Sequence, residues 1–172
     1  MDRCVPAYTP KVMPGALERL KQLGYELPSP PAPQASYVPT RTVPLGGGRA
    51  LVYVSGQVSQ RPDGTRMTGR VPDEVSVEDA QEAARLCALN ILSQVEAVAG
   101  LDNVEQVAQV MGFVLSADGF GEQPKVVNGA SDLIGEVLGE AGRHTRAALG
   151  TNALPGSVTC EVAAVFVVRT GG

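Results

Sequence analysis

The sequence predicts a single domain of the α+β class, in which a mixed β-sheet carries two helices on one face. A chain of 172 residues is long enough for one hydrophobic core and short for two. Two stretches with apolar residues at the helical period, 76–99 and 124–139, alternate with short stretches rich in β-branched residues. The elements that follow from these patterns come in the order β-β-α-β-α-β-β.

The N-terminal part, residues 1–35, is predicted to form a helix and an arm before the main domain, residues 36–172. A helix over 14–24 has proline in its first turn, leucines on one face and glycine at its end. Residues 27–34 contain four prolines, which rule out both a helix and a central strand. We expect this segment to be an extended, solvated connector on the domain surface.

The first two strands are predicted to form a hairpin. Residues 51–58 are β-branched and follow the flexible run of three glycines at 46–48. A Pro-Asp-Gly turn at 62–64 leads into a second short strand at 65–68.

The two long helices are predicted from a capping residue in one and an apolar stripe in the other. Ser76 fits the N-cap of helix 76–99, and Asp79 stands where the Glu of a capping box would be. Helix 124–139 has an apolar stripe that we expect to face the sheet.

The remaining strands are predicted at 104–115, 144–151 and 158–168. The last is apolar almost throughout, as expected of a central strand with both faces covered. Each long helix links two strands, so right-handed crossovers place both helices on one face. The other face, rich in Val and Leu, then has no cover within the chain, and this predicts self-association.

Composition and charge exclude several classes of function. The net charge is -4, the isoelectric point is near 5.0, and the 14 Lys and Arg residues form no run. Nucleic-acid binding draws on a basic face and aromatic stacking platforms, and the chain has neither signal, so no nucleic-acid partner is expected. No apolar run approaches the ~20 residues of a membrane span, and no membrane partner is expected.

The cysteines indicate a reducing compartment. Cys4, Cys87 and Cys160 are odd in number and lack C-x-x-C spacing, and the latter two lie in apolar patterns as buried thiols do. With His144 as the single histidine, neither a zinc site nor another metal site is expected. The N-terminus lacks a signal-peptide or transit-peptide pattern, so we expect a cytoplasmic protein.

Several segments follow one another in the order seen in a known family. They are V-S-G-Q at 54–57, the stretch from Arg to Leu-Pro at 146–155, and V-T-C-E-V-A-A at 158–164. Tyr37 and Asn128 also stand at positions where that family has Tyr and a helical Asn. On these residues the chain resembles the YjgF-type reactive-intermediate deaminases, also known as RidA-like or endoribonuclease L-PSP-like proteins. The stretches 120–133 and 139–146 resemble a longer branch of the family.

This resemblance implies a chorismate-mutase-like fold and a homotrimer with ligand pockets at its subunit interfaces. It further implies hydrolysis of reactive enamines and imines, such as 2-aminoacrylate, to 2-keto acids and ammonia, with no cofactor. Because imines react readily with water, holding the substrate and positioning one water molecule suffices for useful acceleration.

Arg146 and Glu161 are the predicted catalytic residues. By the resemblance, Arg146 holds the substrate carboxylate, for which a guanidinium offers a rigid bidentate fork. Its alternative role is a salt bridge with one of the 18 acidic residues. Glu161 interrupts an apolar strand, and by the resemblance it orients water or the imine nitrogen. Its alternative role is a buried structural pair with Lys or Arg.

Other residues are predicted to bind the substrate. Tyr37 is a candidate wall of the pocket, and Ser55 and Gly56 are candidates to approach the ligand through their backbone. Asn128 is equally open to a binding role or a structural role on its helix face. His144 shares a strand face with Arg146 and is a candidate proton donor in the substrate pocket, although a lone histidine is more often structural.

Two positions depart from the short members of the family. Ala148 stands where the family often has Cys or Ser, which removes one polar contact and bears on the substrate range. Residues 123–125 look like an insertion, and Lys125 is either a pocket residue or a solvated helix start.

Three functions therefore remain open at this point. The first is a hydrolytic deaminase of small carboxylated enamines and imines. The second is a trimeric small-acid sensor or regulator without turnover, which Ala148 favours. The third is an endoribonuclease, against which the acidic charge and the single histidine argue.

Overall fold

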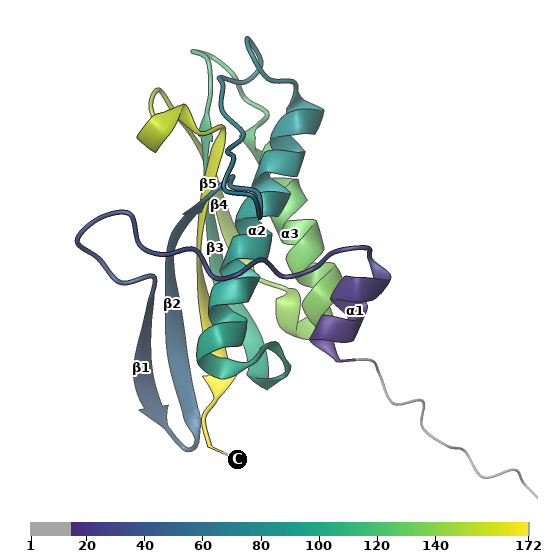
Figure 1. Ribbon diagram of the computed structural model, residues 1–172, viewed down its shortest axis with the longest axis vertical. Coiled ribbons are helices and arrows are strands. Elements are labelled where there is room, and N and C mark those ends of the chain that lie inside the picture. The colour runs from purple at the N-terminus through teal and green to yellow at the C-terminus, as the bar shows by residue number, and fades with distance from the viewer. Residues whose placement is uncertain (1–14, 172) are drawn as a thin grey trace, which may run out of the picture.

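The computed structural model describes residues 15–171, in which a five-stranded mixed sheet carries two long helices on one face (Figure 1). The strands lie in the spatial order β1-β2-β5-β3-β4. They are β1 Thr40–Gly46, β2 Arg49–Val58, β3 Val104–Leu115, β4 Thr145–Thr151 and β5 Cys160–Arg169. The helices are α1 Ala16–Gln22, α2 Val77–Ala99 and α3 Gln123–Leu138, with 3-10 turns at Leu101–Asn103, Gly139–Gly142 and Pro155–Ser157.

The pairing of the strands confirms the predicted class and arrangement. β5 lies antiparallel between β2 and β3, and β4 adds to β3 in parallel. Helix α2 connects β2 to β3, α3 connects β3 to β4, and both pack on the same side of the sheet (Figure 1). The predicted order β-β-α-β-α-β-β is therefore present.

The predicted hairpin between strands 51–58 and 65–68 is wrong, because the hairpin in the structure joins β1 to β2. The partner of β2 is β1, and residues 60–68 make only isolated bridges, Gln60 with Arg66 and Thr68 with Val158. The sequence pattern does not predict β1, because it is an exposed edge strand that contains Pro44. An edge strand tolerates proline and needs little hydrophobic alternation. Gly47 and Gly48 form the turn between β1 and β2 with φ of 59° and 71°, which glycine adopts without strain.

Helix α2 begins as predicted. The Ser76 side chain accepts a hydrogen bond from the Asp79 amide at 3.0 Å, as an N-cap does. α2 and α3 pack so closely that a Cβ added to Gly129 would lie 2.0 Å from the Gln81 carbonyl oxygen. Gly129 therefore sets the spacing between the two helices.

The N-terminal helix and arm pack onto this framework. Ala16 and Leu20 of α1 are buried in the same core as the sheet and the two long helices. In the proline-rich arm, the Pro31 carbonyl accepts a hydrogen bond of 2.7 Å from Gln94 of α2. Pro14, at the predicted start of α1, lies outside the described residues.

Two of the three cysteines lie in the core as predicted. Cys87 and Cys160 are buried free thiols, and the Cys87 thiol lies 3.4 Å from the Cys160 carbonyl oxygen. Burial raises the pKa of the Cys87 thiol well above its usual value, so this group is unreactive. Cys4 lies outside the described residues.

The sheet face opposite the helices is apolar and open. Alternate residues of every strand point to this side, and several are large hydrophobic side chains. They include Val43, Tyr53, Met111 and Leu149, of which Tyr53 is 46% and Leu149 54% exposed. No element within residues 15–171 covers them, as the sequence predicted.

Candidate functional site

Arg146 lies on the edge strand β4 and points toward α3. Its Nη1 donates to Asn128 Oδ1 at 2.8 Å and to Ser131 Oγ at 3.0 Å, and its Nη2 donates to the Pro124 carbonyl at 3.2 Å. The register of β4 explains this direction, because Arg146 pairs with the core residue Val110, whose side chain faces the helices. Asn128 and Ser131 are one helical turn apart on α3, so their side chains reach the same guanidinium.

The charge of Arg146 is not neutralised within residues 15–171. All three partners are neutral oxygens, and no carboxylate forms an ion pair with it there. A guanidinium has five N–H donors, so one donor on Nε and one on Nη2 remain without a described partner. Two such donors are what a bidentate contact with a carboxylate requires. The alternative of an ion pair within this part of the chain therefore does not account for Arg146.

His144 extends this cluster through Ser131. Its Nδ1 lies 2.6 Å from the Gly142 carbonyl oxygen and its Nε2 lies 3.0 Å from Ser131 Oγ. A carbonyl only accepts, so Nδ1 carries the hydrogen, and in neutral His144 the Nε2 accepts from the serine hydroxyl. The Ser131 oxygen in turn accepts from Arg146. His144 thus fixes Ser131, which fixes the guanidinium.

The second cluster surrounds Glu161, near the start of β5. An open pocket with a volume of about 540 Å³ lies here. Its lining residues come from the N-terminal arm, the end of β2, the following loop and β5: Gln34, Ala35, Tyr37, Ser55, Gly56, Val58, Arg66, Pro155 and Glu161. Four of the residues predicted from the sequence, Tyr37, Ser55, Gly56 and Glu161, therefore meet in one pocket.

The Glu161 carboxyl group is half-buried and makes no hydrogen bond or ion pair with a side chain of residues 15–171. Its burial raises the pKa of the carboxyl above the usual value, because water is removed from the charged form. A buried structural pair with Lys or Arg in this part of the chain is therefore excluded. A carboxyl whose pKa is raised toward neutrality is suited to accept and return a proton.

Gly56 leaves room for this carboxyl group. A Cβ added to Gly56 would lie 1.9 Å from Glu161 Oε1, so the carboxyl group would have to move. The β2–β5 register shifts between Val54 and Gln57, so Ser55 and Gly56 together oppose one residue of β5. Such a bulge redirects the strand locally, and bulges are frequent beside binding sites.

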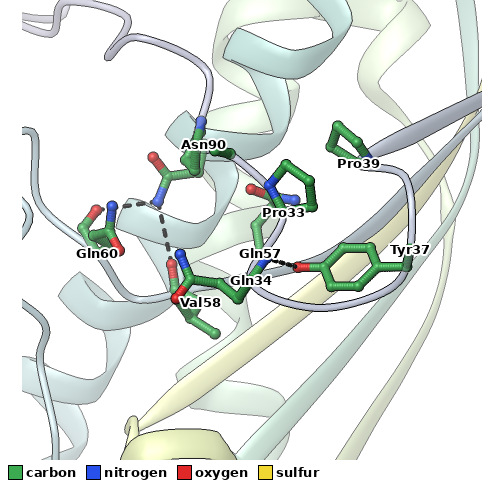
Figure 2. Close-up of a pocket in the computed structure, with 11 residues that line it drawn as sticks. Pro33, Gln34, Tyr37, Pro39, Gln57, Val58, Gln60 and Asn90 are labelled. Carbon is green, nitrogen blue, oxygen red and sulfur yellow. Dashed lines mark hydrogen bonds between the residues drawn. The ribbon is translucent and has the colours of Figure 1, made fainter.

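The arm closes one side of the pocket. Tyr37 Oη accepts a hydrogen bond of 3.3 Å from the backbone N–H of Gln34, which shapes the loop that carries both residues (Figure 2). Ser55 donates to the Val38 carbonyl at 2.8 Å, which fastens this loop to β2. Figure 2 shows a second, smaller pocket that shares Gln34 and Tyr37 with this one, where Asn90 of α2 donates to the carbonyl groups of Val58 and Gln60. The predicted connector therefore forms part of a pocket wall.

The two clusters lie on opposite faces of the sheet. Glu161 pairs with Phe113, and Phe113 pairs with Leu149, whose side chain is exposed on the open face. Arg146 instead belongs to the row of Val110 and Ala164, both buried under the helices. One subunit therefore does not bring Arg146 and Glu161 together.

Two other predicted positions lie near Arg146 without forming a polar contact. Ala148, two residues along β4, packs partly buried against the core. Lys125 forms an ion pair with Glu122, three residues earlier, and both side chains are substantially exposed. Lys125 is therefore a solvated residue at the start of α3.

The sequence patterns missed Ser131, Gln34 and Arg66. Ser131 shares a helix face with Asn128, and this spacing is the signal that was available. Arg66 lies in an irregular loop, and Gln34 in the arm, where no periodicity marks a pocket residue.

Among residues 15–171, no group of three or more His, Cys, Asp or Glu side chains could hold a metal ion. Within the same range, no helix has the length and apolar character needed to cross a bilayer.

Comparisons with known proteins identify the class to which this fold belongs. Residues 17–167 match the model of a family described as YjgF/chorismate_mutase-like, putative endoribonuclease. Since the match covers most of the chain, the protein belongs to the YjgF family, which also includes the RidA proteins.

Individual relatives place the chain more closely. Protein TCP17 of Trypanosoma cruzi is 43% identical over 148 residues, which are 85% of this chain and 89% of TCP17. Atu1372 of Agrobacterium tumefaciens, a protein described as having unknown function, is 43% identical, with a TM-score of 0.78 over 90% of this chain and 94% of its own. A protein from Shewanella oneidensis MR-1 described as a putative endoribonuclease is 29% identical, with a TM-score of 0.80 over 89% and 99% of the two chains. These similarities confirm the family and the chorismate-mutase-like fold that the sequence motifs predicted.

Proposed function

We propose that the protein is a hydrolytic deaminase that converts small carboxylated enamines and imines to 2-keto acids and ammonia. The observation that carries this proposal is the Arg146 guanidinium. It is held by three neutral oxygens and keeps two donors without a described partner. A small ligand has few atoms to bury, so a bidentate charged contact is the main affinity it can use.

Glu161 is the proposed proton carrier of the reaction. Water adds to the carbon of the protonated C=N bond while Glu161 accepts one of its protons, which gives a neutral carbinolamine. Glu161 then returns this proton to the nitrogen. As the C–N bond breaks and ammonia leaves, Glu161 accepts the hydroxyl proton and the carbonyl forms. The raised pKa of Glu161 supports these proton transfers, since general acid–base catalysis is best when the pKa lies near the working pH. An enamine enters the same path after protonation at carbon gives the protonated imine.

The complete site in this proposal contains Arg146 of one subunit and Glu161 of another. Two observations support it: the two residues lie on opposite faces of one sheet, and the open face presents uncovered Tyr53, Met111 and Leu149. In a closed cyclic assembly, the same contact between neighbouring subunits recurs at every interface, and we propose that this assembly is a homotrimer.

Sedimentation equilibrium tests the assembly. We expect a mass three times the 17.8 kDa of the chain at micromolar concentration. A monomer under these conditions would contradict both the trimer and the shared site.

Titration calorimetry with pyruvate and 2-oxobutyrate tests the role of Arg146. We expect wild type to bind both acids and Arg146→Ala to bind neither, with the assembly intact. Arg146→Lys should recover little affinity, because an ammonium group cannot form the two parallel hydrogen bonds of a guanidinium. Equal affinity in all three proteins would show that Arg146 is structural.

A second candidate is a small-acid binding protein without turnover. Ala148 favours it, because this side chain offers no polar group beside Arg146. Tight binding of 2-keto acids without faster keto-acid formation from 2-aminoacrylate would establish this function instead. RNA cleavage has less support, since the chain is acidic and its pocket brings together one arginine and one glutamate.

A further inference from the structure

Arg66 is a second arginine whose charge is not neutralised, and it lines the same pocket as Glu161. Its Nη2 donates to Gln34 Oε1 at 2.8 Å and its Nε donates to Gln60 Oε1 at 3.3 Å. Both partners are neutral amides, and no carboxylate within residues 15–171 forms an ion pair with Arg66. Two glutamines from different segments thus hold this half-buried guanidinium in place while its charge remains available.

Arg66 lines the pocket and keeps N–H donors without a described partner. Of its five N–H donors, two are used by the glutamines and both on Nη1 have no described partner. Nη1 lies close to Gly156, where an added Cβ would be 3.4 Å away. Glu161 does not neutralise Arg66, since burial is the cause of the Glu161 pKa shift and no cation lowers it.

We propose that Arg66 is an anion subsite that selects substrates with a second acidic group, so that the preferred enamines and imines are dicarboxylic. This inference rests on the proposed function, in which Arg146 of a neighbouring subunit holds the first carboxylate. The completed site then contains two arginines and one glutamate. An iminium with two carboxylates carries the complementary two negative charges and one positive charge.

The size of the pocket agrees with a substrate larger than 2-aminoacrylate. Its volume of about 540 Å³ lies in the range of pockets that hold ligands much larger than a three-carbon acid. Arg66 meets this space from the loop after β2, and Glu161 meets it from β5. A longer substrate could therefore reach Arg66 with its distal carboxylate.

The test compares 2-oxobutyrate with 2-oxoglutarate as probes, by titration calorimetry of wild type, Arg66→Gln, Arg66→Lys and Arg146→Ala. Arg66→Gln should weaken 2-oxoglutarate binding about tenfold or more and change 2-oxobutyrate binding less than about twofold, as loss of a contact to one charged group predicts. Arg66→Lys keeps the charge, so its affinity for 2-oxoglutarate should lie between that of wild type and that of Arg66→Gln. Arg61→Gln is the matched control, because Arg61 is an exposed arginine of the same loop that does not line the pocket, and it should change neither affinity.

The outcomes separate this inference from the proposed function. If Arg66→Gln changes both affinities equally, or neither, the subsite is wrong. If 2-oxobutyrate binding depends on Arg146 while 2-oxoglutarate is insensitive to Arg66, the proposed function stands and the subsite falls. If 2-oxoglutarate depends on Arg66 but not on Arg146, the subsite stands and the proposed function falls. Failure of wild type to bind either acid contradicts both.

Discussion

Substitution of Gly56 by alanine tests the position of Glu161 without removing its carboxyl group. The added Cβ would lie 1.9 Å from Oε1, 2.8 Å from Cδ and 3.0 Å from Cγ of Glu161. The carboxyl must therefore move by about 1 Å or more, and a misplacement of this size at a reacting group costs roughly 100-fold in rate. The group that moves is the end of a flexible side chain. The stability cost should therefore be about 1 kcal/mol, at the lower end of the range for overpacking.

The assay follows 2-keto acid formation from 2-aminoacrylate generated in situ, together with urea unfolding of each protein. Gly121→Ala is the matched control, because a Cβ there meets nothing within 4 Å, and it should keep wild-type rate and stability. A Gly56→Ala protein with a near wild-type rate would refute the reasoning that Glu161 acts from this position. Loss of several kcal/mol of stability would instead show that the position is structural.

Two further substitutions test the electrostatics of Glu161 and the helix packing. Glu161→Gln should lose most turnover yet stay within about 1 kcal/mol of wild type in urea unfolding at neutral pH, since a loss of roughly 3–5 kcal/mol would indicate a broken buried pair. Because burial raises the folded pKa of Glu161, wild-type stability should fall as the pH rises from its usual 4.5 through the raised value, and this contribution should be absent in Glu161→Gln. Gly129→Ala should lose roughly 2 kcal/mol or more of unfolding free energy, because its Cβ would lie 2.0 Å from the Gln81 carbonyl oxygen. Gly135→Ala in the same helix is the control: its Cβ meets nothing within 4 Å, so its stability should equal or exceed that of wild type. Equal unfolding midpoints for the two alanine variants would contradict this packing argument.

The fold could be predicted wherever local physics decides the structure. Periodicity and the Ser76 cap placed α2 within one residue, and β-branched apolar residues placed β3 at its observed bounds. β1 could not be found in this way, because an exposed edge strand interrupted by Pro44 carries almost no alternation. The pairing of β1 with β2 is fixed by the Gly47-Gly48 turn and by contacts with Tyr53 and its neighbours, which appear only in the folded structure.

The candidate site was predicted as a list of residues and not as an arrangement. Motif order selected Arg146 and Glu161, yet only strand register shows that they face opposite sides of the sheet. Ser131 lacked any signal except its spacing from Asn128, and Arg66 enters the pocket because a loop without periodicity folds beside the arm. These contacts arise from long-range packing, which single-sequence patterns do not encode.

The most direct test of a site shared between subunits is complementation between two inactive variants. Arg146→Ala subunits keep Glu161, and Glu161→Gln subunits keep Arg146. The two are unfolded, mixed in equal amounts and refolded together, and keto-acid formation from 2-aminoacrylate is then measured. In a cyclic trimer with random mixing, about one quarter of the sites receive both intact halves. We therefore predict that each variant alone is inactive and that the mixture recovers about a quarter of the wild-type rate. A mixture no more active than either variant alone, beside an active wild type refolded in the same way, would contradict the shared site.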